Sequence, residues 1–270
     1  MPINFTKGCI VAALILTGVS VSAFRTTEDK GKMRLRGITT ATDRTVISYN
    51  EDKSVAELLT TYKTDEGSYT TTRIPVYKNG RLIRTYITDD EASHAPTLFA
   101  AYEYSPKGNI RRIVYYLSGE VHGYDSLAYN NEGRISARYS FGDSPDGIAF
   151  ENNSCQYYTW DNRGNILTIE NMGRVNRKLP FTLSSTTSYS YDNHPNAQQS
   201  IPSLAYLVDI AAVNLSANNI ITETITPATG GNSIINHYAY AYNEAAYPTQ
   251  ITTRYAAGDE TVVTDLEWTW

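Results

Sequence analysis

The sequence predicts an all-β protein, an antiparallel up-and-down meander of roughly a dozen or more strands curled into a barrel or half-barrel. Tyr is abundant, with 22 copies against 6 Phe, and aromatic and β-branched residues suit a pleated, half-buried surface. Beyond residue 45, short runs of Tyr, Thr, Ile and Val alternate with clusters of Gly, Asn, Asp and Pro. One such cluster recurs along the chain, which indicates an internal repeat.

The N-terminal residues 1–23 predict a secretory signal peptide. Lys7 precedes the apolar run GCIVAALILTGVSV, and small residues end the segment at Val21-Ser22-Ala23. The apolar run is shorter than the ~20 residues that a membrane-spanning helix needs, so we expect cleavage after Ala23. Residues 24–44 lack periodicity and predict a flexible N-terminal segment, which leaves residues 45–270 as a single repeat-built β domain.

The recurring turn has an aromatic residue, then Gly four positions later and Ile two positions after the Gly. It occurs as YSPKGNI at 104–110, YNNEGRI at 129–135 and WDNRGNI at 160–166, with looser forms near Tyr77, Tyr191 and Ala241. We predict that the aromatic residue ends one strand, that Gly accepts the positive φ of the turn, and that Ile begins the next strand. The spacing of 25 to 31 residues between units fits two strands and two turns each.

Alternation of apolar and polar residues predicts which side chains share a face of each strand. In RISARYSF, one face carries Ile135, Ala137, Tyr139 and Phe141. In the last segment, one face carries Val262, Thr264, Leu266, Trp268 and Trp270. A period of two with one apolar face is typical of an antiparallel sheet that covers a core on one side.

One segment interrupts the repeat between Asn193 and Asn214. Here the sequence PNAQQSIPSLAYLVDIAAVN predicts a short helix or loop at about 203–214, with Ser203 as its N-cap and Leu204, Leu207, Val208 and Ala211 on one side. A single helix in a β chain most often covers one end of the core as a plug or lid. We therefore expect function to be found in this interruption.

The turn units resemble the YD repeats of RHS-type proteins, although this chain has too few units for their large shells. The signal peptide, the turn units, YSYDNHPNA with the following IPSLAYL, and the terminal YAYAYNEAAYPTQITTRY resemble an exported Bacteroidetes family of unknown function with a porin-superfamily-like β-barrel fold. The resemblance covers residues 45–270 and implies a barrel in the cell envelope. It supplies no catalytic residues. The chain departs from the family's pattern in lacking a well-placed lipobox Cys, because Cys9 precedes the apolar run.

Composition and motifs exclude several function classes. The formal net charge is −5 without a basic cluster, so we expect no nucleic-acid partner. Removal of the signal peptide leaves Cys155 as the single cysteine, which excludes an intrachain disulfide. The four His residues show no metal-site spacing, and no nucleophile, phosphate-loop or cofactor motif occurs, so we predict no catalytic residue, cofactor or metal site.

The function that the sequence favours is non-catalytic binding or assembly by an exported protein of the periplasm or cell surface. Its expected partner is a glycan, a lipid or an envelope protein, and the candidate ligand contacts are Trp160, Tyr191, His194 and Tyr206. We do not expect membrane insertion, because Arg84, Glu103 and Arg112 interrupt predicted strands. The alternatives are a purely structural β scaffold and an envelope hydrolase with a His–acid pair or paired carboxylates, for which loop acids stand at Asp89, Asp90, Glu91, Asp143 and Asp146.

Overall fold

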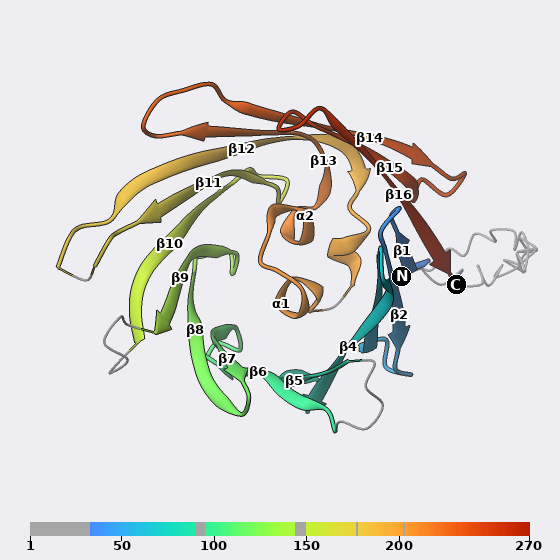
Figure 1. The fold of residues 1–270 in the computed structure, drawn as a ribbon, viewed down its shortest axis with the longest axis horizontal. Coiled ribbons are helices and arrows are strands. Elements are labelled where there is room, and N and C mark those ends of the chain that lie inside the picture. Colours follow the sequence, from blue (N-terminus) through green and yellow to red (C-terminus); the bar gives the residue numbers. More distant parts are fainter. Residues whose placement is uncertain (1–32, 90–94, 144–149, 177, 202) are drawn as a thin grey trace, which may run out of the picture. The chain divides into compact units, whose positions relative to one another are not determined.

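The computed structural model of the protein describes residues 33–89, 95–143, 150–176, 178–201 and 203–270. The predicted signal peptide lies outside the described residues, as do Asp90, Glu91 and Asp146. Within the described residues, sixteen strands form one closed barrel in which every strand pairs antiparallel with its neighbours in sequence and β1 pairs with β16 (Figure 1). The predicted all-β meander is therefore confirmed, and the barrel is closed.

The strands follow one another around the barrel wall. They are β1 Arg34–Thr39, β2 Asp43–Tyr49, β3 Val55–Thr64, β4 Gly67–Lys78, β5 Arg81–Asp89, β6 Thr97–Tyr104, β7 Ile110–Leu117, β8 Glu120–Tyr129, β9 Ile135–Asp143, β10 Phe150–Trp160, β11 Ile166–Gly173, β12 Thr182–Pro195, β13 Asn218–Pro227, β14 Ile234–Tyr242, β15 Pro248–Tyr255 and β16 Glu260–Thr269.

The barrel begins earlier in the chain than the sequence predicts. Residues 34–44, expected to be part of a flexible segment, form β1 and the start of β2. The inner side chain Leu35 is fully buried and pairs with Trp268 of β16. The sequence hides this strand because it is short and carries a Gly, and because its pairing partner lies at the other end of the chain. The remaining residues of that segment, 24–32, lie outside the described part of the chain.

The recurring turns connect strands as predicted. Trp160 ends β10, Gly164 has φ +92°, and Ile166 begins β11. A β-bulge follows each turn: Trp160 pairs with Ile166 while Thr159 pairs with Thr168, so Leu167 is the extra residue. Eight of the aromatic residues that pair next to a register shift are Tyr49, Tyr77, Tyr104, Tyr129, Trp160, Tyr191, Tyr242 and Trp268. We call these eight residues the aromatic belt.

The bulges correct the predicted faces of β9. Ser136 is an extra residue, so the strand changes phase after Ile135. Ile135 is buried in the core, whereas Tyr139 and Phe141 face outward. Arg138 lies on the inner face, where it meets Asp209 from inside the barrel. For β16 the prediction holds for Leu266, which is buried, but Trp270 lies beyond the strand and is 72% exposed.

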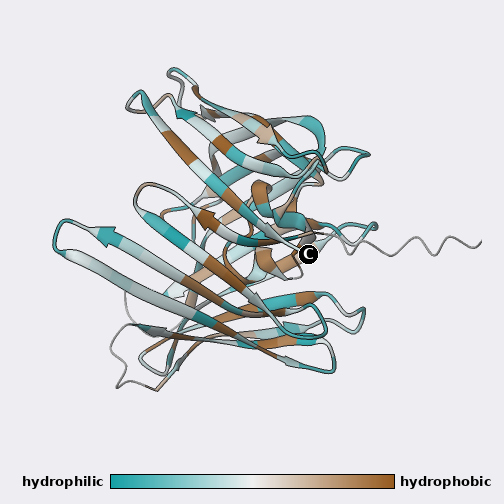
Figure 2. Cartoon of the chain, turned by 90° about the vertical axis from the view of Figure 1, so that its right-hand side faces the viewer, coloured by the Kyte–Doolittle hydropathy of each residue, from teal (hydrophilic) through white to brown (hydrophobic). Residues whose placement is uncertain are grey.

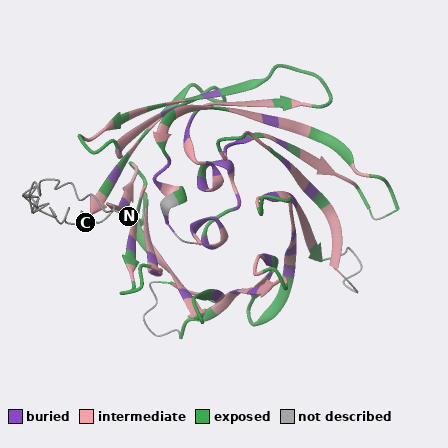
Figure 3. Ribbon diagram, turned by 180° about the vertical axis from the view of Figure 1, so that it is seen from behind, coloured by how far each residue is buried: buried purple, intermediate pink, exposed green. Residues whose placement is uncertain are grey.

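The interruption of the repeat enters the barrel. Residues 196–217, which we call the plug, connect β12 to β13 and lie inside the ring of strands (Figures 1 and 3). Instead of one helix, the plug contains a 3-10 turn at Gln198–Ser200 and two single helical turns, α1 Leu204–Leu207 and α2 Ala212–Leu215. Ser203 has φ +64° and makes no side-chain cap, so the predicted capping role is wrong.

The hydrophobic core lies between the plug and the inner face of the wall. Leu204, Leu207 and Ile210 of the plug are buried against wall residues such as Leu58, Ile113 and Ile169. Of the predicted apolar side of the helix, Val208 is instead 52% exposed. Short hydrophobic and hydrophilic stretches alternate along the strands (Figure 2). The interior is a packed core for part of its length, which fixes the plug in place.

Candidate functional site

The aromatic belt carries two of the four predicted contact residues. Nε1 of Trp160 donates a hydrogen bond to the carbonyl oxygen of Ile135 at 2.7 Å, and the Tyr191 hydroxyl donates to that of Ile166 at 2.7 Å. Each bond reaches back to the first residue of the return strand in the preceding hairpin. The same bond recurs from Tyr49, Tyr104, Tyr129 and Trp268 to the carbonyls of Leu35, Leu82, Ile110 and Pro248.

The other two predicted residues also make internal contacts. The His194 ring stacks on Tyr242 at 4.1 Å between ring centres, and its backbone N–H donates to Asp192 Oδ1 at 2.9 Å. The Tyr206 hydroxyl, on the plug, lies 3.3 Å from that of Tyr129. The four residues are not gathered at one cavity; Trp160 borders a hollow at the turns with Asp161 and Asn130.

The plug is bound to the wall by hydrogen bonds to its own backbone carbonyls. Arg73 of β4 donates to the carbonyl oxygen of Leu207, Tyr102 of β6 to that of Tyr206 at 3.0 Å, and Tyr158 of β10 to that of Ile210 at 3.3 Å. These carbonyls lie at or just beyond the end of α1, where a helix leaves acceptors without partners. Burial raises the pKa of Tyr102 to about 12, while its hydrogen bond from Thr85 opposes that shift.

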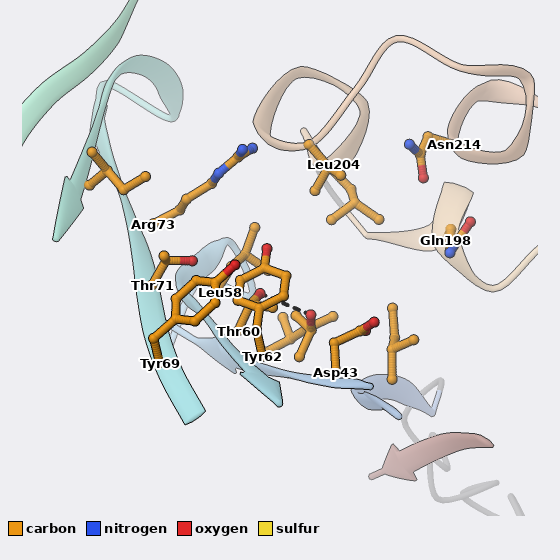
Figure 4. A pocket seen from close by; sticks show the side chains of 15 residues that line it. Asp43, Leu58, Thr60, Tyr62, Tyr69, Thr71, Arg73, Gln198, Leu204 and Asn214 are labelled. Atoms are coloured by element: carbon orange, nitrogen blue, oxygen red, sulfur yellow. Dashed lines mark hydrogen bonds between the residues drawn. The ribbon is translucent and has the colours of Figure 1, made fainter. Parts of the chain in front are cut away.

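A cavity of about 460 Å³ lies between the plug and the first five strands (Figure 4). This volume falls within the range of small-molecule sites, about 300–1,000 Å³. Its rim reaches solvent, because Tyr69 and Val208 are each about half exposed. The lining residues are Ile38, Asp43, Thr45, Ile47, Leu58, Thr60, Tyr62, Tyr69, Thr71, Arg73, Ile87, Gln198, Leu204, Val208 and Asn214.

The wall side of this cavity carries an aromatic pair and a row of hydroxyls. Tyr62 and Tyr69 face each other across β3 and β4, with ring centres 4.8 Å apart and planes 19° apart. Thr45 and Thr60 share a hydrogen bond of 2.9 Å. Figure 4 shows the two rings and the Asp43 carboxylate on the wall, with Gln198 and Asn214 on the plug across from them. The surface is therefore amphipathic.

These residues were not predicted from the sequence, although a signal was present. The segment TTYKTDEGSYTTT has Asp65-Glu66 at its centre, with Gly67 directly after. A hairpin centred there pairs Thr64 with Gly67 and Tyr62 with Tyr69, which is the observed register. Gln198 and Asn214 gave no comparable signal, because their place depends on how the plug folds back into the barrel.

A second cavity, of about 630 Å³, lies along β8 to β10 and contains the predicted type of His–acid pair. His122 Nδ1 lies 3.4 Å from Asp143 Oδ2, and both side chains are exposed. Asp125, which also lines this cavity, is 2% exposed and accepts hydrogen bonds from Tyr115 at 2.7 Å, Arg138 at 2.8 Å and Ser140 at 2.8 Å. Three side chains thus hold the Asp125 carboxylate, which fits a structural role.

Comparisons with known proteins give a likeness of fold. A porin-like protein from Bacteroides uniformis superposes with a TM-score of 0.56 and 13% identity over 88% of this chain and 96% of its own. A porin-like protein from Bacteroides vulgatus superposes with a TM-score of 0.43 and 11% identity over 88% of this chain and 99% of its own. The TcdB2-TccC3-TEV structure superposes with a TM-score of 0.28 and 14% identity over 83% of this chain and 11% of its own. No family model and no curated protein matches the chain.

The first of these likenesses confirms the porin-like barrel that the sequence resemblance implied. At 13% identity it bears on the fold alone. None of the helices in the described residues is long and apolar enough to span a bilayer. Among those residues, no group of three or more His, Cys, Asp or Glu side chains is arranged to hold a metal ion.

Proposed function

We propose that this protein is an exported, non-catalytic binding protein whose ligand occupies the cavity between the plug and strands β1 to β5. The observation that carries the proposal is the cavity itself: a space of about 460 Å³, open at its rim and lined by both wall and plug. Sixteen strands enclose a lumen wider than side chains alone can fill, and the plug occupies only part of it, so a space remains that a ligand can enter. The wall residues that line the cavity also include both Tyr rings and Thr hydroxyls.

The cellular location of the protein is part of the proposal. The predicted signal peptide of residues 1–23 supports export to the periplasm or cell surface, and the porin-like fold is compatible with the exported family that the sequence resembles. Outward polar pairs support a barrel that is not embedded in lipid: Glu103 bonds to Arg111 at 3.1 Å, and Arg44 to Glu267 at 3.1 Å. A charged side chain facing lipid near the bilayer centre costs roughly 2–4 kcal/mol.

The cavity proposal is tested by filling the cavity from the wall. Thr60 faces the cavity and shares a hydrogen bond with Thr45, whereas its neighbour Thr61 faces outward and shares one with Thr70. Thr60→Trp should weaken binding of a cavity ligand at least tenfold, about 1.4 kcal/mol, and Thr61→Trp should leave it unchanged. Binding is measured by nuclear magnetic resonance titration with a panel of oligosaccharides and fatty acids, and thermal unfolding verifies the fold of both variants. Equal effects of the two variants would refute the proposal.

A hydrolase is the second candidate, because the His122–Asp143 pair borders the second cavity. If the protein hydrolyses a member of the same panel and His122→Ala abolishes turnover in a folded protein, the non-catalytic assignment is wrong. The bonds to Asp125 count against this candidate, since that carboxylate is already satisfied by three side chains.

A further inference from the structure

We propose that the ligand of the cavity beside the plug is a neutral carbohydrate, bound with a sugar ring against the Tyr62–Tyr69 pair. This inference rests on the proposed function and specifies the class of ligand. Three features support it: the aromatic pair at the rim, hydrogen-bonding groups on opposite sides of the cavity, and a charge pattern that suits neither an anion nor an acyl chain.

The aromatic pair offers a flat apolar surface at the entrance. The two rings stack on each other, so one face of each ring is covered by the other while the pair's outer surface remains available. Tyr69 is 49% exposed, so the outer face of the pair can be reached from solvent. A sugar ring has an apolar face of C–H groups, which packs on an aromatic face, and the phenol hydroxyls can bond to its rim.

A buried acceptor on the plug lacks a partner. Oε1 of Gln198 is shielded from solvent, and no donor among the described residues reaches it. Leaving a buried acceptor unbonded is unfavourable, so proteins rarely retain one. Gln198 lines the cavity, and turning its side-chain amide over would aim this acceptor at a ligand hydroxyl, a donor of the kind that completes its bonding.

A second acceptor stands on the wall. The hydroxyls of Thr40 and Thr42 both donate to Oδ2 of Asp43, at 2.8 Å and 3.2 Å, and no donor of the described residues reaches Oδ1. Asp43 and Gln198 line the same cavity from opposite sides. A sugar ring carries hydroxyl groups on several of its edges, so one ring can bond to both of these separated acceptors. A ligand with a single polar end can bond to only one of them.

The charges of the cavity disfavour an anionic ligand. Its one guanidinium among the lining residues, that of Arg73, donates to the carbonyl of Leu207 and lies 4.9 Å from the centre of the Phe99 ring. The Asp43 carboxylate would repel a second negative charge. The hydroxyls of Thr45, Thr60 and Thr71 cross the wall where an acyl chain would need an unbroken apolar surface. A neutral, hydroxyl-rich molecule satisfies both conditions.

The experiment titrates the purified protein with neutral tetrasaccharides derived from cellulose, xylan, mannan and chitin, and with palmitate and a galacturonate tetramer as contrasting classes. We expect at least one neutral tetrasaccharide to bind with a Kd in the millimolar range or tighter. Tyr62→Leu and Tyr69→Leu should each weaken that binding about tenfold, because each removes half of the platform. Tyr62→Phe, which keeps the ring, should weaken it no more than about threefold.

The matched control is Tyr124→Leu. Tyr124 stacks on Phe141 with ring centres 4.4 Å apart, in a cross-strand pair of similar geometry on the outside of the barrel. Its substitution should leave carbohydrate affinity within about twofold. Gln198→Leu provides an independent readout: affinity should fall while the unfolding temperature stays constant or rises, since the buried oxygen has no partner in the described protein.

The outcomes separate the two proposals. Palmitate or the galacturonate tetramer binding in a manner that Thr60→Trp abolishes, with no neutral tetrasaccharide bound, would overturn the carbohydrate assignment and leave the cavity proposal standing. Carbohydrate binding that ignores Tyr62→Leu and Tyr69→Leu would place the sugar elsewhere and overturn the inference. If no probe binds at millimolar concentration, both proposals fail.

Discussion

The polar tips of six of the eight belt residues explain why Tyr and Trp, rather than Phe, end these strands before the turns. Phe has the same ring but no donor, whereas Tyr and Trp bond the carbonyl of the preceding hairpin. That carbonyl sits beside a β-bulge, where the regular ladder is interrupted. The Arg34, Arg81 and Arg134 side chains lie over the belt rings of Tyr49, Tyr104 and Trp160 at 5.2–5.6 Å.

Replacing Trp160 by Phe tests this role of the donor. The substitution keeps most of the buried ring but leaves the Ile135 carbonyl without its 2.7 Å bond. We expect Trp160→Phe to lower the free energy of unfolding by about 1–2 kcal/mol, measured by urea denaturation. Trp270→Phe is the control: Trp270 is 72% exposed, so its substitution should change stability by less than about 0.5 kcal/mol. Similar losses in both variants would contradict a specific role for the indole N–H.

For single residues, the sequence predicted their positions in the turns better than their hydrogen-bond partners. The aromatic–Gly–Ile spacing placed Trp160, Gly164 and Ile166 correctly, because a tight turn dictates its own local residues. His194 likewise makes a local turn bond, from its backbone N–H to Asp192. The bond from Trp160 to Ile135 crosses to the preceding hairpin, and nothing local in the sequence specifies that distance.

A charge cluster that is buried on its wall side also joins the plug to the wall. Arg138 of β9 bonds to Asp125 of β8 through Nε and NH2, each at 2.8 Å, and to Asp209 of the plug at 3.2 Å. The Asp125 side chain is only 3% exposed. Removing one member of a buried ion pair leaves the other charge without compensation, which is far more costly than removing an exposed pair.

Substitution of Arg138 should therefore be severe. We expect Arg138→Met to lower the free energy of unfolding by about 3 kcal/mol or more, and Asp125→Leu in the same chain to recover part of that loss. Arg112→Met is the matched control on the outer face, where Arg112 lies 3.8 Å from Glu103 and both are well exposed. It should cost less than about 1 kcal/mol. Urea denaturation checks all three variants, and equal effects of Arg138→Met and Arg112→Met would refute the buried cluster as the principal link.

Strands were more predictable than the faces they present. Alternation identified RISARYSF as a strand, but the bulge at Ser136 shifts the phase by one and puts Arg138 inside. Bulges leave no simple mark in one sequence, since Ser136 differs little from its neighbours. On β7 no bulge falls between Arg112 and Val114, and both lie on the outer face.

Many buried tyrosines make the whole barrel sensitive to alkali. Burial raises the pKa of Tyr49, Tyr77 and Tyr102 to about 12 in each case, and it raises that of Tyr129 and Tyr191 as well. In the unfolded chain tyrosine loses its proton near pH 10, at about its ordinary value. Above that pH the folded state holds more protons than the unfolded state, so stability falls as pH rises.

The expected result is an unfolding temperature that stays flat from about pH 7 to 9 and falls steadily above about pH 10. Absorbance of tyrosinate should resolve two groups of tyrosines, one that titrates normally and one that ionises only as the protein unfolds. Tyr49→Phe should reduce the slope of stability against pH above about pH 10, because one shifted group is removed. A single titration of all tyrosines near pH 10 in a folded barrel would contradict this prediction.

The architecture of the whole barrel could be predicted only in part from the sequence. Counting turn units indicated about a dozen strands. The hairpin around Tyr49 and the pairing of Trp268 with Leu35 were not predicted, because neither has the Gly–x–Ile ending. Closure depends on that last pairing. The cavity could not be predicted either, since it arises where the plug, with its own Gln198, stops short of the wall.

The pairing of β1 with β16, which we call the seam, also fixes the order in which the strands of the barrel can pair during folding. Leu35 and Trp268 stand near opposite ends of the chain, so their pairing must wait until the last strand has been synthesised. Every other wall contact joins consecutive strands and can form locally, at a lower cost in chain entropy. Until the seam closes, β1 and β16 each offer an unpaired edge to other chains. Newly made molecules are thus exposed to cross-pairing for as long as the final strand is delayed, which would make folding yield dependent on protein concentration.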